Sequence, residues 1–157
     1  MKIFNRLFYS LALITFIAGF FLPIDKYIVP RTGIGFYLGI SGCTAMLLAI
    51  LIYSVPRRMN WFKSPVAVQS AFNAHRVLGV LGPIAVLYHC GYHLGAPNSN
   101  MALYAMVAVV IAGLVTMLLT LIPTIDKYTK WWRMVHIPAT FFLVITAIVH
   151  VMAFIVY

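Results

Sequence analysis

The sequence predicts an all-α integral membrane bundle of about five transmembrane helices. Of its 157 residues, 64% are hydrophobic and only 8% are charged, and the mean hydropathy is +1.01. A soluble domain of this size would not carry so much apolar surface. Apolar stretches of nearly 20 residues recur along the chain, and this is the length at which a helix crosses a bilayer.

Five apolar stretches are the expected spans, and together they form a single transmembrane domain over residues 1–157. They cover residues 7–22, 33–55, 77–95, 101–123 and 134–157. The first is the shortest, and the basic residues before it also resemble the start of a secretory signal. No A-x-A cleavage site follows, and the run ends at Pro23, which favours a retained helix. Cleavage would leave four spans with the histidines unchanged.

The basic residues give the bundle an orientation. Nine of them fall on one side of a five-span arrangement: Lys2, Arg6, Arg57, Arg58, Lys63, Arg76, Lys127, Lys130 and Arg133. Only Lys26 and Arg31 remain for the other side. The positive-inside rule therefore places the N-terminus in the cytoplasm and the C-terminus outside. This placement accounts for the net charge of +9 without a nucleic-acid partner.

Two histidine pairs with the same spacing lie inside the apolar segments. Thirteen residues separate His75 from His89, and thirteen separate His136 from His150. At about 1.5 Å and 100° per residue, each pair lies on nearly one helix face, about 21 Å apart. The third and fifth helices run in the same direction, so His75 matches His136 near the cytoplasmic end and His89 matches His150 further out. A lone histidine in a membrane more often bonds a carbonyl or hydroxyl, but two equal pairs favour a ligand role.

The spacing points to haem iron, which takes one axial ligand on each face of the porphyrin. Zinc would need three or four ligands at one point, whereas the two levels are about 20 Å apart. The sequence therefore predicts two non-covalent, bis-histidine b haems between the third and fifth helices, ligated by His75 with His136 and by His89 with His150. No C-x-x-C-H motif for covalent attachment occurs. Such six-coordinate iron serves electron transfer.

Other residues near the histidines have two interpretations each. His93 follows His89 by one turn and is an alternative ligand, although the equal spacing favours His89. Arg76 and Arg133 lie at the cytoplasmic level, where haem propionates would want cations, and a purely topological role explains them equally well.

Small residues also allow two interpretations. Gly35 and Gly39 form a G-x-x-x-G pattern that is typical of helix packing. Gly79 and Gly82 follow His75 on its own face, where they would make room for a flat macrocycle or simply for close packing.

Several of these residues also carry a family resemblance. The segments are His75-Arg76-Val77-Leu78-Gly79, Tyr88-His89, Trp132-Arg133-Met134-Val135-His136 and His150. They resemble the ferric reductase-like transmembrane domain, a superfamily of ferric reductases, NADPH oxidases and the haem subunit of a bacterial periplasmic methionine sulfoxide reductase. The resemblance covers about residues 32–157, and the paired H-x13-H is its specific part.

The resemblance implies a cytochrome b that carries electrons outward, in a bacterial inner membrane. Many members continue into a cytoplasmic FAD and NAD(P)H domain, whereas this sequence stops at Tyr157. Electrons are therefore expected from a separate flavoprotein, from quinol or from another subunit, and they would pass to an external redox partner. The chain would be the electron-transfer subunit of an oxidoreductase.

Two alternatives remain at this point. The chain is a quinol-oxidising membrane anchor of a larger redox complex, or it is a non-redox membrane protein whose histidines bind transition-metal ions. Quinol-dependent haem reduction would identify the first, and metal binding without a haem absorption band would identify the second.

Overall fold

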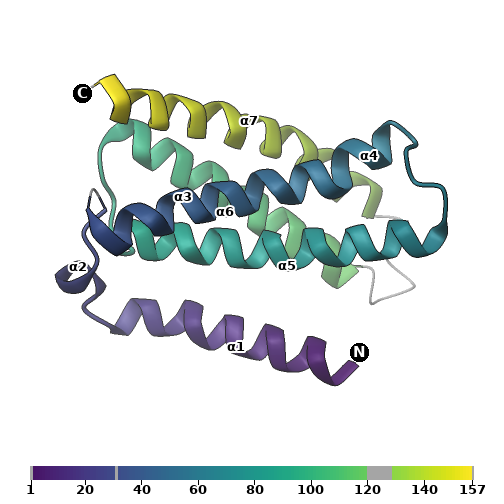
Figure 1. Cartoon of the computed structure of the whole chain (residues 1–157), viewed down its shortest axis with the longest axis horizontal. Coiled ribbons are helices and arrows are strands. Elements are labelled where there is room, and N and C mark those ends of the chain that lie inside the picture. The colour runs from purple at the N-terminus through teal and green to yellow at the C-terminus, as the bar shows by residue number, and fades with distance from the viewer. Residues whose placement is uncertain (1, 31, 120–128, 157) are drawn as a thin grey trace. The chain divides into compact units, whose positions relative to one another are not determined.

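The described part of the chain is helical and contains no strand. The computed structural model describes residues 2–30, 32–119 and 129–156 (Figure 1). Its elements are α1 (Lys2–Phe21), α2 (Ile24–Tyr27), α3 (Gly33–Ala49), the π-helix η1 (Ile50–Ser54), α4 (Val55–Arg58), α5 (Pro65–His89), α6 (Pro97–Leu119) and α7 (Thr129–Val156). The all-α prediction is confirmed for these residues.

Four helical segments are long and apolar enough to cross a bilayer. They are Gly33–Arg58, Pro65–His89, Pro97–Thr116 and Trp131–Val156. The remaining expected span, over residues 7–22, corresponds to the shorter apolar helix Leu7–Phe21. Four of the five expected spans are therefore confirmed by length and composition. Residues 120–123 of the fourth expected span, together with Arg31, Lys127 and Tyr157, lie outside the described residues.

The chain divides into two compact units, Met1–His93 and Leu94–Tyr157. In the first unit α3 packs along α5, and α1 also contacts α5; in the second unit α6 packs along α7. Each unit thus contains one long helical hairpin (Figure 1). The organisation of residues 1–157 as a single domain stays a prediction.

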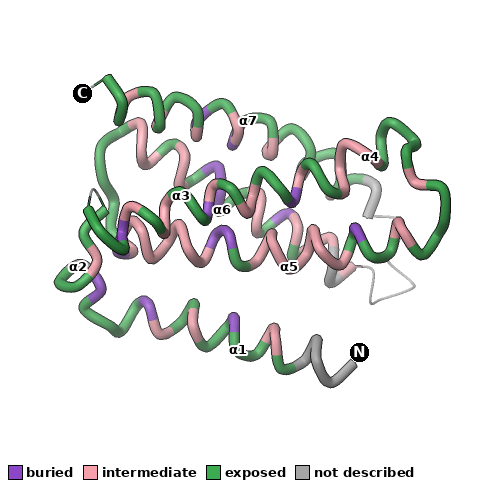
Figure 2. The backbone as a smooth tube through the Cα atoms, viewed as in Figure 1, coloured by how far each residue is buried: buried purple, intermediate pink, exposed green. Residues whose placement is uncertain are grey.

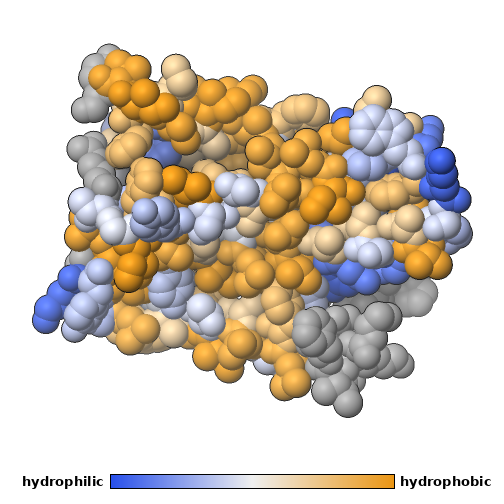
Figure 3. All heavy atoms as spheres, viewed as in Figure 1, coloured by the Kyte–Doolittle hydropathy of each residue, from blue (hydrophilic) through white to orange (hydrophobic). Residues whose placement is uncertain are grey.

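Most of the helix surface is apolar and exposed, as a bilayer requires. Few described residues are buried (Figure 2). Met106 in α6 is the largest of the described side chains that is fully buried. Large apolar side chains point outward instead, such as Phe21, which is 83% exposed, and Ile155, which is 70% exposed. Figure 3 shows hydrophobic residues along the helices and hydrophilic ones near α4. Outward apolar side chains on this scale need a lipid environment.

The α5 helix begins twelve residues before the expected start at Val77. Ser64 caps it, because its hydroxyl accepts the amide N–H of Ala67 at 3.2 Å, and Pro65 suits the first helical position. Hydropathy alone missed this start, since the first turns carry polar side chains. Two of them, Gln69 and Asn73, bond each other at 3.0 Å.

The α5 helix also ends six residues early, at His89. Gly91 and Tyr92 both have φ of 60°, so the backbone turns left-handed and the helical path stops. A residue that follows this turn, such as His93, therefore does not continue the α5 face that carries His75 and His89.

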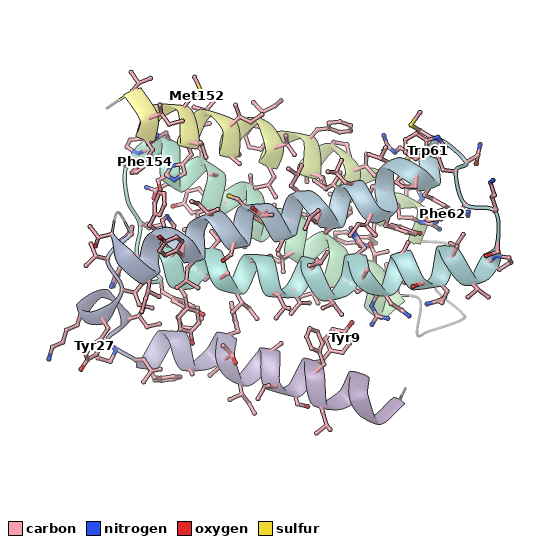
Figure 4. The ribbon with its side chains drawn as sticks, viewed as in Figure 1. Tyr9, Tyr27, Trp61, Phe62, Met152 and Phe154 are labelled. Carbon is pink, nitrogen blue, oxygen red and sulfur yellow. The ribbon has the colours of Figure 1, made fainter. Side chains whose placement is uncertain are left out.

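Polar and ring contacts hold α1 against α5 and against the turn that follows it. The hydroxyl of Tyr88 donates to the Thr15 carbonyl at 2.8 Å, and that of Tyr92 donates to the Phe16 carbonyl at 3.0 Å. Burial, with smaller contributions from the neighbouring Tyr88 and Cys90, raises the pKa of Tyr92 to about 12, so its hydroxyl stays a donor. Toward the other end of α1 lies Tyr9 (Figure 4). Its ring centroid is 5.2 Å from the Arg76 guanidinium.

Candidate functional site

The site is built on a very close helix crossing in the first unit. Gly42 of α3 meets Gly82 of α5, and a Cβ on Gly42 would lie 2.9 Å from the carbonyl oxygen of Gly82. Only glycine allows two backbones to approach so closely. The crossing assigns Gly82 to helix packing, whereas a Cβ on Gly79 would meet nothing within 4 Å.

His75 and His89 lie one heptad before and one heptad after Gly82, and both reach α3. Nδ1 of His75 is 2.9 Å from the carbonyl oxygen of Ala49, and Nδ1 of His89 is 2.8 Å from that of Gly35. These two acceptors lie one heptad after and one heptad before Gly42. The fourteen-residue step on α5 is therefore matched by an equal antiparallel step on α3, and both imidazoles face the same neighbouring helix.

The second unit repeats this contact. Nδ1 of His136 in α7 is 3.1 Å from the carbonyl oxygen of Val109 in α6. One turn further along α7, the hydroxyl of Thr140 donates back to the His136 carbonyl at 2.8 Å. The Thr140 hydroxyl is therefore satisfied within its own helix, and the imidazole of His136 is held by α6.

These three contacts fix the tautomer of each ring. A carbonyl oxygen can only accept a hydrogen bond, so Nδ1 must carry the proton in His75, His89 and His136. In the neutral ring Nε2 is then the basic nitrogen. Metal-ligating histidines commonly use this arrangement, in which a carbonyl holds one nitrogen and the metal takes the other.

The two remaining histidines lie in different settings. His150 is half-buried in α7, fourteen residues beyond His136. His93 is exposed and follows the left-handed turn at Gly91 and Tyr92, so it does not continue the α5 face that carries His75 and His89. The structure thus removes the geometric reason for considering His93 as a ligand on that face.

The two arginines of the expected site also differ. Arg76 is half-buried, and its guanidinium lies over the Tyr9 ring, at 5.2 Å from the centroid, and over the Phe72 ring, at 5.8 Å. The structure therefore gives Arg76 a packing role toward α1. Arg133 is exposed in the first turns of α7. Contact of either cation with a propionate stays a prediction.

Sequence reasoning missed the residues that receive the imidazoles. The G-x-x-x-G pattern favours helix packing for Gly35 and Gly39. In the structure, Gly35 also supplies a carbonyl to His89, and a Cβ on Gly39 would lie 2.8 Å from Nδ1 of that ring. The available signal was the seven-residue spacing of Gly35, Gly42 and Ala49, which mirrors the spacing around Gly82. This spacing indicates the acceptor carbonyls only when the register of α3 against α5 is known, and the sequence alone does not give that register.

Other candidate sites are weaker. An apolar groove of about 540 Å³ runs along α3 and is lined by side chains such as Tyr37, Thr44 and Leu78. No histidine is among its described lining residues. Over the described ranges, no three His, Cys, Asp or Glu side chains come together as an ion site. The histidine contacts with α3 and α6 therefore remain the most specific chemistry in the fold.

Comparison of the chain with protein-family models, with curated proteins and with solved structures finds no match in any of the three.

Proposed function

We propose that this chain is a diheme cytochrome b, the membrane electron-transfer subunit of an oxidoreductase. Its histidines would hold two b haems, His75 with His136 at the cytoplasmic level and His89 with His150 at the outer level. Electrons would enter from a cytoplasmic-side flavoprotein or quinol and leave to an external acceptor. The basic residues support this orientation, with the N-terminus in the cytoplasm of a bacterium and the C-terminus outside.

One observation carries the proposal: three of the four proposed ligands have Nδ1 on a backbone carbonyl. A histidine that only needed to satisfy its polarity in lipid could do so through either nitrogen. The same nitrogen is used in both units, which leaves Nε2 as the basic nitrogen in all three rings. This is the donor that an axial ligand requires.

The set of histidine ligands also fits a b haem. Haem iron with two imidazole ligands supplies one-electron transfer without an open coordination position. Each helix then has to supply only one histidine per level, and the described residues offer single histidines and no three-ligand cluster. The polypeptide contributes ligand orientation, a low dielectric constant and exclusion of water around each level.

Haem quantitation of the full chain tests the proposal. The protein is purified in detergent from a haem-replete host, and b haem is measured by pyridine haemochrome and by reduced-minus-oxidised spectra. We expect two haems per chain, and about half of the haem signal in His89→Ala. One haem or none in the wild-type protein would overturn the two-level proposal, as would bound metal ions without a haem band.

His93→Ala is the matched control, since it removes a histidine only four residues from His89. We expect it to retain both haems, because His93 lies beyond the end of α5. Haem loss equal to that of His89→Ala would contradict the ligand assignment. Reduction by a short-chain quinol, compared with reduction by a flavin reductase and NADH, then separates the two donor classes.

A further inference from the structure

The carbonyls that receive the imidazoles share a local arrangement, which we call a histidine seat. A seat is the acceptor carbonyl together with the residue four positions later in the same helix. In an α-helix that later residue lies one turn above the carbonyl, so its side chain would stand where an approaching ring must lie. A seat therefore requires this position to be open.

Glycine opens two of the three seats. For His89 the acceptor is Gly35 and the later residue is Gly39, whose Cβ would be 2.8 Å from Nδ1 of the ring. For His136 the acceptor is Val109 and the later residue is Gly113, whose Cβ would be 3.3 Å from Cε1. Glycine thus occurs at the same position in both units.

The third seat has no glycine, and there the helix itself changes. The acceptor for His75 is Ala49, and the later residue is Tyr53, which lies in the π-helix Ile50–Ser54. A π-turn holds an extra residue, which shifts the side chains that follow it around the helix axis. The Tyr53 ring consequently lies beside His75, with centroids 5.4 Å apart, and does not block its bond to Ala49.

We infer that Gly39, Gly113 and the π-turn at Ile50–Ser54 are positioning elements for the proposed ligands. They admit each imidazole to a carbonyl of the preceding long helix, which fixes the Nδ1–H tautomer and the direction of Nε2. The inference rests on the proposed function only in assigning Nε2 to haem iron. The tautomer itself is a property of the polypeptide.

Alanine substitutions at three glycines should displace the imidazole rings to different extents. An alanine at Gly39 puts a methyl carbon 2.8 Å from a ring atom, well inside the contact distance of about 3.5 Å, so the His89 ring must move. An alanine at Gly113 starts from 3.3 Å and needs a smaller shift. An alanine at Gly79 meets nothing within 4 Å and is the matched control.

The test is a tautomer measurement on the haem-free full chain. Protein labelled with ¹⁵N-histidine is prepared in detergent micelles at about pH 8.5, where a free imidazole is neutral. Two-bond ¹H–¹⁵N correlations then report which nitrogen is protonated, and single His→Gln variants assign the signals. We expect Nδ1–H for His75, His89 and His136. Nε2–H in any of the three would overturn the seat at that position.

Variants then test the positioning elements one at a time. Gly39→Ala should convert His89 from Nδ1–H to a tautomer mixture and leave His75 unchanged, while Gly79→Ala changes neither. Deleting Ile52 removes the extra residue of the π-turn and should release His75 alone. Gly113→Ala, with its milder contact, keeps the test informative if Gly39→Ala does not fold. Unchanged tautomers in Gly113→Ala and in the Ile52 deletion would refute the inference.

A spectroscopic readout links the seats to the proposed haems. A hydrogen bond at Nδ1 raises the basicity of the ligating nitrogen, so Gly39→Ala should shift the midpoint potential and the low-spin EPR signal of one haem only. Failure of the proposed function and failure of the histidine seats give different results. Nδ1–H tautomers without haem binding would refute the proposed function and leave the seats, whereas two haems with Nε2–H tautomers would refute the seats alone.

Discussion

Replacing Gly42 with alanine should loosen the α3–α5 hairpin at its crossing. The new Cβ would lie 2.7 Å from Cγ2 of Val86 and 2.9 Å from the carbonyl oxygen of Gly82. The carbonyl is a backbone atom and cannot rotate away, so the helices must separate by about 0.5 Å to reach ordinary contact. Both histidine bonds to α3, now 2.9 and 2.8 Å, would then stretch toward the weak end of the hydrogen-bond range.

Overpacking of this kind costs about 1–3 kcal/mol. An alanine also favours the helix by up to about 1 kcal/mol over glycine, which would partly hide the loss. Gly79→Ala in α5 corrects for this gain, because its Cβ meets nothing within 4 Å. The free-energy difference between the two variants should therefore be close to the overpacking cost alone.

The assay is thermal or chemical unfolding of the haem-free full chain in detergent, followed by circular dichroism, so that any contact of Gly79 with a haem does not enter the comparison. Gly42→Ala should unfold with a free energy about 1–3 kcal/mol below that of Gly79→Ala. Equal stability of the two variants would show that the close Gly42–Gly82 approach is not maintained in the folded protein, and that α3 and α5 do not have the register that brings His75 and His89 to their carbonyls.

Three further outcomes are expected. Ser64→Ala removes the cap of α5 and should lower the unfolding free energy by about 1 kcal/mol, with recovery in Ser64→Asp. Tyr88→Phe loses the bond to Thr15 and should speed amide exchange in α1 about fivefold, whereas the exposed Tyr104→Phe leaves it unchanged. Because the pKa of Tyr92 is raised from 10.0 to about 12, its contribution to stability is complete below pH 10 and declines as the pH rises toward 12. Alkaline unfolding of Tyr92→Phe should lack this decline.

Hydropathy predicted the long helices but not where they begin. The apolar run after His75 marked the third expected span from Val77, whereas a Ser-Pro cap twelve residues earlier starts the helix. Such capping is a local hydrogen-bond signal, and a search for apolar residues passes over it. The early end has a different cause, because Tyr92 adopts a positive φ that its residue type does not indicate.

The histidine spacing predicted that His75 and His89 share one helix face, but no sequence pattern predicted the carbonyls that receive them. A fourteen-residue step places two side chains on one face whatever the neighbouring helix is, and both His75 and His89 do contact α3. Which atoms receive them depends on the register of the two helices, in which Gly42 meets Gly82. A π-turn is still less visible, since Ile50–Ser54 reads as an ordinary apolar helix.

Both units contain a histidine seat, and the proposed function explains why the chain has two long hairpins. In the first hairpin Ala49 and Gly35 of the first helix accept from both histidines of the second, and in the second hairpin Val109 accepts from His136, so each hairpin orients at least one imidazole with its own residues. Haem iron with two imidazole ligands needs a second histidine for each level. Under the proposed function one hairpin therefore supplies half of the ligands, and a second hairpin with the same H-x13-H spacing supplies the rest. The equal spacing then follows from chemistry, because two levels set by one helix must be matched at the same separation by the other.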